Sequence, residues 1–205
     1  MMPSVVATRG VFAAWVLFVP LMFWARGRAG KGATNTRELT SLVAIALQGV
    51  GLAIAWNWHG QTPIPLMPGS HLAQWTITLA AVVLAFASVL FAVAAIRTLG
   101  KQWSLVARVV EGHLLVRSGP YRIVRHPIYL ALMGLLVATG IAFGTPLGIG
   151  LGVGVYLWGT WLRVRSEERL LLAKLGDSYA HYAQEVPAIL PAPWRHRVRK
   201  SLRVE

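Results

Sequence analysis

HPIYLALMGLLVATGIAFGTPLGIGLGVGVYLWGTWL, residues His126–Leu162, contains no Asp, Glu, Lys or Arg. A transmembrane helix needs about 20 consecutive apolar residues, so this stretch has room for two of them. The sequence FGTPLG near its middle supplies a turn, because Pro146 is tolerated in the first turn of a helix that follows Gly144. The stretch therefore predicts a helical hairpin that crosses a membrane twice.

A second uncharged block runs from Leu39 to Ile96 and also has room for two spans. The apolar segment 11–25 adds one more, and 56% of the residues are hydrophobic against 13% that are charged. These proportions argue against an ordinary soluble domain and favour a polytopic, all-α membrane protein. We expect about five transmembrane helices, near residues 10–25, 39–57, 72–96, 127–143 and 145–163.

The last of these segments carries glycines four residues apart, in the sequence GIGLGVGVY. Gly148 and Gly152 form one pair, and Gly150 and Gly154 form another. Small residues at this spacing let helix backbones approach closely in membranes, so we expect both pairs to lie in helix contacts. A nucleotide-binding loop does not fit, because GxGxxG requires glycine where Val153 stands.

Basic residues lie almost entirely on one side of this predicted topology. Of the 20 Lys and Arg residues, 19 fall in the connections 26–38 and 97–125 or after Leu162, and Arg9 is the exception. The positive-inside rule makes these regions cytosolic, which places the N-terminus outside and the C-terminus in the cytosol. Membrane insertion and anionic lipid headgroups then account for the net charge of +13, so no nucleic-acid partner is expected. The chain has no cysteine, which excludes disulfides and thiolate metal sites.

Three polar elements meet on the predicted cytosolic side: GHLLV (112–116), GPYRIVRHPIY (119–129) and RVRSEE (163–168). Arg163 and Glu167 are four residues apart, so they share a helix face and can pair. Residues of these types also serve as topology determinants and interfacial anchors, and the residue types alone leave that interpretation open. Their convergence with a helix N-terminus instead favours a site for a ligand that carries both signs of charge.

Together, the segments IRTLGKQWS, GHLLVRSGPYRIVRHPIY and RVRSEERLLLAKLGDSYAHYAQEVPAILP resemble the isoprenylcysteine carboxyl methyltransferase family. The resemblance covers Ile96–Pro191 in the expected order and spacing. It implies an integral-membrane enzyme that transfers a methyl group from S-adenosylmethionine, with a cytosolic cofactor pocket formed by the C-terminal half of the chain. The chain then divides into N-terminal transmembrane helices (1–95), a methyltransferase region (96–191) and a basic cytosolic tail held to anionic lipid (192–205).

The resemblance also assigns roles to individual residues. Glu167 would hold the ammonium group of the cofactor and Arg163 would face the methyl acceptor, so these two are the expected catalytic residues. The expected cofactor pocket is lined by His113, Leu114, Leu115, Val116, Tyr121, His126, Pro127, Ile128 and Tyr129. A glutamine that the family carries upstream of HxLV has no counterpart here, because Val106 stands near that position and Gln102 is out of register. No metal is expected.

The chemistry of the acceptor separates the remaining alternatives. A carboxylate is ionised at neutral pH, so its methylation needs orientation by a guanidinium such as that of Arg163 and no general base. We therefore expect a lipophilic acceptor of the isoprenylcysteine type that enters from the bilayer. An aminophospholipid or a thiol must lose a proton, for which Glu168 and His126 are the candidate bases. A sterol reductase would need a nicotinamide pocket that the sequence does not show, and a lipid-binding scaffold is the alternative outside the enzymes.

Overall fold

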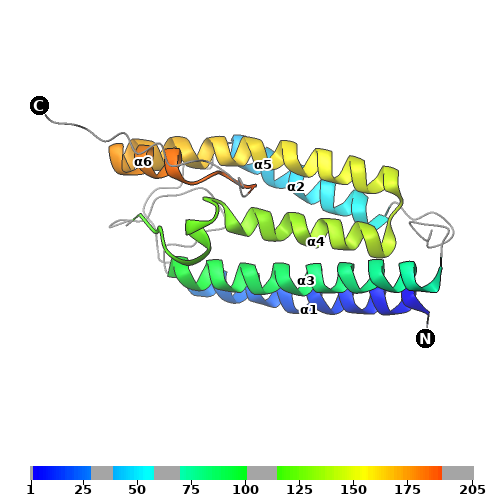
Figure 1. The fold of residues 1–205 in the computed structure, drawn as a ribbon. Helices are drawn as coiled ribbons and strands as arrows, with labels where there is room; N and C mark the ends of the chain where they lie inside the picture. The colour runs from blue at the N-terminus through cyan, green and yellow to red at the C-terminus, as the bar shows by residue number, and fades with distance from the viewer. Residues whose placement is uncertain (1, 29–38, 58–69, 101–114, 191–205) are drawn as a thin grey trace, which may run out of the picture.

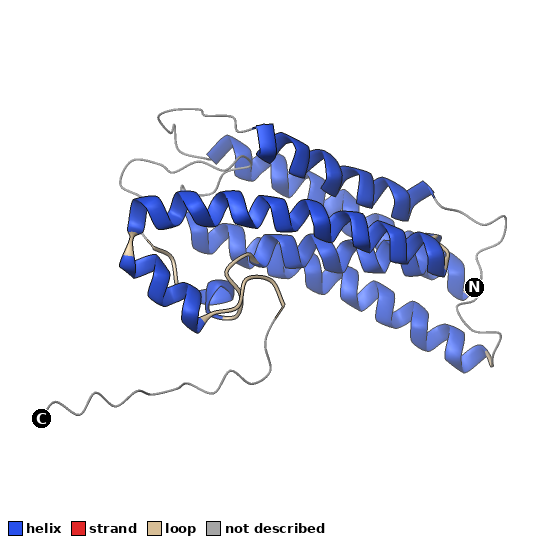
Figure 2. Ribbon diagram, turned by 90° about the horizontal axis from the view of Figure 1, so that it is seen from above, coloured by secondary structure: helices blue, strands red, loops and turns tan. Residues whose placement is uncertain are grey.

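The computed structural model describes residues 2–28, 39–57, 70–100 and 115–190, and all regular structure in these ranges is helical (Figure 2). The elements are α1 (Pro3–Arg28), α2 (Leu39–Asn57), α3 (His71–Leu99), the 3-10 helix η2 (Gly119–Arg122), α4 (Pro127–Phe143), α5 (Pro146–Leu175) and α6 (Asp177–Glu185). The predicted all-α class is confirmed, and α2 and α4 have the bounds expected from the uncharged blocks. α1, α3 and α5 extend beyond the predicted segments, and α5 continues past Arg163 to Leu175.

Prolines and glycines set the ends of the C-terminal helices. Pro127 and Pro146 each lie in the first turn of their helix, where a missing N–H costs no hydrogen bond. The Thr145 hydroxyl caps α5 by accepting a hydrogen bond from Gly148 N at 3.1 Å. α5 ends at Gly176, whose φ of 53° suits a residue without a side chain. The predicted hairpin turn is therefore confirmed.

α4 lies at the centre of the bundle, between the pair α2 and α5 and the pair α1 and α3 (Figure 1). It contacts each of the other four long helices, and it has no charged residue. Leu135, Leu136 and Ala138 on α4 are completely buried. No residue of α4 is fully exposed, because four helices pack around it, and an uncharged sequence suits this position.

Three helices of the described chain are long and apolar enough to cross a membrane, over Pro3–Gly27, His71–Leu99 and Pro146–Leu175. α2 and α4 contain shorter apolar helices, Thr40–Trp56 and Pro127–Phe143. Large apolar side chains such as Leu90 and Trp158 are exposed on the outside of the bundle, which is typical of a surface that lipid covers. These features support a membrane-embedded bundle, while the count of five spans stays a prediction for the two shorter helices.

α2 and α5 pack closely through glycine. A side chain at Gly51 of α2 would place its Cβ 2.7 Å from Gly152 O of α5. A side chain at Gly159 of α5 would place its Cβ 2.8 Å from Ala44 O of α2. The two contacts lie in reverse order along the two helices, so α2 and α5 run antiparallel.

The two glycine pairs predicted in α5 have different outcomes. Gly148 and Gly152 are buried, and the close approach predicted for this pair is confirmed at Gly152. Gly150 and Gly154 are exposed with no atom within 4 Å of a Cβ, so the prediction that they pack is wrong. Both pairs have the same spacing, and only the rotation of α5 about its own axis decides which of them meets α2.

Aromatic side chains fill the end of the bundle where α4 joins α5. The ring of Trp56 on α2 lies 6.3 Å from that of Trp15 on α1 and 4.7 Å from that of Phe143 on α4, between centroids. The Trp15 indole N–H also donates a hydrogen bond to Thr139 Oγ1 at 2.9 Å. These contacts close that end between α1, α2 and α4, and the buried ionisable side chains lie at the opposite end.

We expect Gly159→Ala to lower the free energy of unfolding by about 1–3 kcal/mol, because its Cβ would meet backbone atoms of α2 that cannot rotate away. Gly154→Ala is the matched control, since it adds the same methyl group to an open face of the same helix. The measurement is the thermal midpoint of the purified protein in detergent. Equal midpoints for the two variants would contradict the close contact at Gly159.

Candidate functional site

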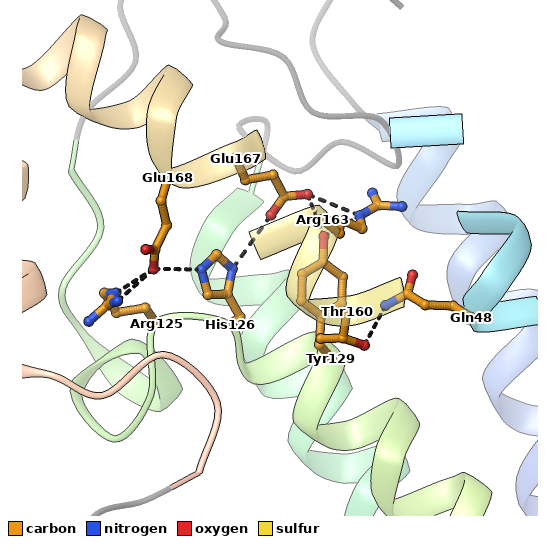
Figure 3. Close-up of polar contacts among 8 residues, drawn as sticks. All are labelled: Gln48, Arg125, His126, Tyr129, Thr160, Arg163, Glu167 and Glu168. Atoms are coloured by element: carbon orange, nitrogen blue, oxygen red, sulfur yellow. Dashed lines mark hydrogen bonds and ion pairs between the residues drawn. The ribbon is translucent and has the colours of Figure 1, made fainter. Parts of the chain in front are cut away.

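Charged side chains from α5 and from the loop before α4 meet at the end of the bundle that carries α6 (Figure 3). Figure 3 shows them in the order Arg125, Glu168, His126, Glu167 and Arg163. Basic and acidic groups alternate along this row, which we call the polar row. Each charge therefore has an opposite charge beside it, as charges taken out of water require.

Glu167 is the centre of the polar row. Its Oε1 accepts hydrogen bonds from the Tyr129 hydroxyl and from Arg163 Nε, the latter at 3.1 Å. Its Oε2 lies 3.5 Å from His126 Nδ1. The predicted pairing of Arg163 with Glu167 is confirmed, and a helix spacing of four residues accounts for it.

Arg163 is the most deeply buried charge of the row, with 4% of its surface exposed. Its Nε also donates to the Tyr129 hydroxyl, and its Cζ lies 5.3 Å from the centroid of the Tyr129 ring. Tyr129 thus contacts the guanidinium through both its hydroxyl and its ring. Its main-chain oxygen in turn accepts from the Tyr156 hydroxyl at 2.9 Å, which joins α4 to α5 beside Arg163.

His126 lies between the two carboxylates of the row. Its Nδ1 faces Glu167, and its Nε2 lies 3.2 Å from Glu168 Oε1. The imidazole also stacks on the ring of Tyr129, with 5.6 Å between centroids. Burial disfavours the imidazolium, but hydrogen bonds to Glu167 and Glu168 outweigh it and raise the pKa of His126 above its usual value. A protonated His126 donates from both ring nitrogens and holds the two carboxylates apart.

Arg125 joins the polar row to the C-terminal part of the chain. Its Nε and Nη2 donate to Glu168 Oε1 at 2.9 and 2.6 Å, and its Nη1 donates to the main-chain oxygens of Ala183 and Val186. The main-chain N–H of Arg125 donates to Pro187 O at 2.9 Å. Arg125, which lies in the segment GPYRIVRHPIY, is therefore part of the polar row.

Tyr121 of η2 and Tyr179 and Tyr182 of α6 lie beside the polar row, and we call these three residues the tyrosine floor. The Tyr182 hydroxyl donates to Tyr121 O at 2.7 Å, and Leu115 packs beside Tyr179 and Tyr182. Tyr179 is 3% exposed, and its hydroxyl makes no hydrogen bond within the described part of the chain. Burial and the charge of Glu168 raise the pKa of Tyr179, so this hydroxyl stays protonated and is able to donate.

The expected cofactor residues fall into three groups. Tyr121, His126 and Tyr129 lie at or beside the polar row, and Pro127 begins α4 directly after His126. Ile128 packs against Ala25 of α1 and Ile96 of α3, on another side of α4. Leu115 contacts the tyrosine floor and Val116 is partly exposed, while His113 and Leu114 lie outside the described residues.

Two residues near the polar row, Gln48 and Thr160, were not predicted from the sequence. Gln48 Nε2 of α2 donates to Thr160 Oγ1 of α5 at 2.9 Å, and both side chains are buried. Thr160 precedes Arg163 by one helical turn. The only sequence signal was an amide inside an otherwise apolar segment, where polar groups are costly unless they are paired.

Comparison with known proteins links the chain to methyltransferases. A family model described as the isoprenylcysteine carboxyl methyltransferase (ICMT) family matches residues 77–173, from within α3 to near the end of α5. A methanethiol S-methyltransferase of Mycobacterium tuberculosis is 29% identical over 94% of this chain and 74% of that protein.

Isoprenylcysteine O-methyltransferases match a shorter part of the chain. The protein-S-isoprenylcysteine O-methyltransferase B of Arabidopsis thaliana is 32% identical over 47% of this chain, and that of Schizosaccharomyces pombe is 35% identical over 40%. The matches cover 50% and 34% of those two proteins, respectively.

The raised pKa of His126 predicts a stability that depends on pH. A group whose pKa is higher in the folded state contributes its full stabilisation below its unfolded pKa, about 6.5 for histidine, and loses it as the pH rises through the folded pKa. We therefore expect the thermal midpoint in detergent to fall as the pH is raised above about 6.5. His126→Gln should reduce this slope, whereas His181→Gln, at an exposed position on α6, should keep it. An unchanged slope in His126→Gln would contradict the assignment.

Proposed function

We propose that this chain, which belongs to the isoprenylcysteine carboxyl methyltransferase family, transfers a methyl group from S-adenosylmethionine to the carboxylate of a lipophilic, isoprenylcysteine-like acceptor, forming a methyl ester. The observation that carries this proposal is the buried guanidinium of Arg163 at the end of an apolar bundle. A guanidinium binds a carboxylate through two parallel hydrogen bonds and loses less hydration than an ammonium would.

The charges of the polar row favour an anionic acceptor. With His126 protonated, the row has three cations, which include Arg125 and Arg163, and two anions, Glu167 and Glu168. One positive charge is therefore in excess in a partly dry setting. A bound carboxylate would balance it, whereas a neutral acceptor would not.

The residues present fit S-adenosylmethionine, which carries an ammonium, a carboxylate and a sulfonium. Glu167 and Glu168 suit the ammonium, and the N-terminus of α4, directly after His126, suits the carboxylate. The buried, unpaired hydroxyl of Tyr179 offers one further hydrogen bond on the Glu168 side. When bound, the cofactor would supply an electrophilic methyl group.

The residues of the chain would then orient the acceptor and exclude water. Arg163 would hold the acceptor carboxylate, and Tyr129 and Glu167 would keep the guanidinium in one position. No residue needs to remove a proton, because the carboxylate is already ionised. The tyrosine floor and Arg125, which donates hydrogen bonds to the main-chain oxygens of Val186 and Pro187, would cover the reacting groups from the side of α6.

The proposed setting has the polar row at the cytosolic surface, with the N-terminus outside and the C-terminus in the cytosol. The polar cofactor would enter from the cytosol and the lipophilic acceptor from the bilayer. Two features support this arrangement. The ionisable row lies at one end of the bundle, and aromatic side chains close the other end between α1, α2 and α4.

S-methylation of a thiol is the second candidate, because the methanethiol S-methyltransferase match extends over 94% of the chain. A thiol must lose its proton during transfer, so a base is required. His126 is a poor base here, since both ring nitrogens face carboxylates and favour its protonated form. Glu168, at the more exposed end of the row, would be the better proton acceptor.

One experiment separates the two acceptors. The detergent-purified protein is incubated with methyl-labelled S-adenosylmethionine and either an S-farnesylated cysteine acid or an alkanethiol, and the product is then treated with base. We expect label to enter the farnesylated acid and to be released by base as methanol, as a methyl ester requires. Label in the thiol alone, in a product stable to base, would replace the carboxylate by the second candidate.

Arg163→Lys should raise the KM for the farnesylated acid roughly 10- to 100-fold, because lysine cannot form the paired hydrogen bonds and one charge-assisted bond is lost. Affinity for the cofactor should change much less, since that site lies on the other side of Glu167. Arg165→Lys is the matched control, because Arg165 points outward over the ring of Trp161, at 4.3 Å from its centroid. Equal KM values for the two variants would remove Arg163 from the acceptor site.

A further inference from the structure

α2 brings buried polar side chains to the side of α5 that carries Arg163. Gly51 meets Gly152, and seven residues away on each helix Ala44 meets Gly159. The buried positions continue this seam at regular spacing, at Ser41, Ala44, Gln48, Gly51 and Ala55 on α2 and at Gly152, Tyr156, Gly159, Arg163 and Ser166 on α5.

The register of the seam places Ser41 opposite Arg163. Because the helices are antiparallel, one turn before Ala44 on α2 faces one turn after Gly159 on α5. That turn of α2 carries Ser41, and that turn of α5 carries Arg163 and Ser166. All three side chains are buried, and the register puts Ser41 at the level of Arg163 on the packed faces of the two helices.

The hydroxyl of Ser41 is available for a hydrogen bond at the level of Arg163. It is 1% exposed, and its Oγ makes no hydrogen bond within the described residues. A buried hydroxyl without a partner destabilises the folded state, and native proteins rarely contain one without a reason. It lies in the first turn of α2, which begins at Leu39.

The hydrogen bond from Gln48 to Thr160 fixes this register. It joins α2 to α5 two turns from Ser41 and one turn from Arg163. In Figure 3 the Gln48 amide and the Arg163 guanidinium lie on the same side of Tyr129. A slide of one helix along the other would break this buried bond, so it holds Ser41 in place.

We propose that Ser41 is a further acceptor-binding residue, whose hydroxyl donates a hydrogen bond to the carboxylate that Arg163 holds. Gln48 is a positioning residue that acts through the register of the two helices. This inference rests on the proposed carboxyl methylation and adds α2, which lies outside the family-matched residues 77–173, to the site. A carboxylate accepts several hydrogen bonds, so it satisfies the Ser41 hydroxyl and the guanidinium together.

The test compares Ser41→Ala with Ser88→Ala, which removes a buried hydroxyl from α3, away from the polar row. We expect Ser41→Ala to raise the KM for the S-farnesylated cysteine acid roughly 10-fold, the effect of losing one hydrogen bond to a charged group. The dissociation constant for S-adenosylmethionine should stay unchanged. The thermal midpoint without acceptor should be equal to or higher than that of the parent, because an unpaired buried hydroxyl has been removed.

The experiment distinguishes a failure of the proposed function from a failure of the proposed role of Ser41. If the parent protein does not methylate the farnesylated acid, the proposed function fails, and the role of Ser41 fails with it. If the parent does so and Ser41→Ala has the KM of Ser88→Ala, only the role of Ser41 is overturned. A lower thermal midpoint in Ser41→Ala with an unchanged KM would show that Ser41 is a packing residue.

Discussion

The burial of Glu167 in an otherwise apolar bundle is the constraint on which the rest of the site depends. Only 19% of its side chain is exposed, so its charge needs donors from the protein. Tyr129 and His126 supply them from the start of α4, and Arg163 supplies one from α5. The angle between α4 and α5 at this end is therefore set by charge pairing, while the opposite end is held by the tight turn at Pro146.

Charge pairing also joins the polar row to the segment that follows α6. Glu168 follows Glu167 directly, so it points to a different side of α5, where Arg125 and His126 meet it. Arg125 then bonds main-chain oxygens that follow α6. The C-terminal segment and the polar row are thus joined through Arg125, and a change in Glu168 or Arg125 would act on both.

The sequence predicts the helices far better than it predicts their rotation. Pro127 and Pro146 begin helices and Gly176 caps the end of one, and the sequence shows this directly because these residues act through their own backbone. The i to i+4 pairing of Arg163 with Glu167 is local in the same sense. In contrast, the burial of Gly152 rather than Gly154 depends on contact with a helix about 100 residues away in sequence, which spacing alone does not determine.

The candidate site residues also differ in how far the sequence predicts them. Tyr129, His126 and Glu167 could be predicted because their segments carry recognisable chemistry, whereas Ile128, between two of them, turns to α1 and α3. Gln48 could not be predicted, because its role exists only through the register of α2 on α5.

The position of α2 beside the polar row has a functional consequence. The family-matched residues 77–173 contain the whole polar row, while α2, outside them, packs on the helix that carries Arg163. A change in α2 can therefore alter the surroundings of Arg163 without disturbing Glu167 or His126, and under the proposed carboxyl methylation it would change the choice of acceptor while the polar row stays the same.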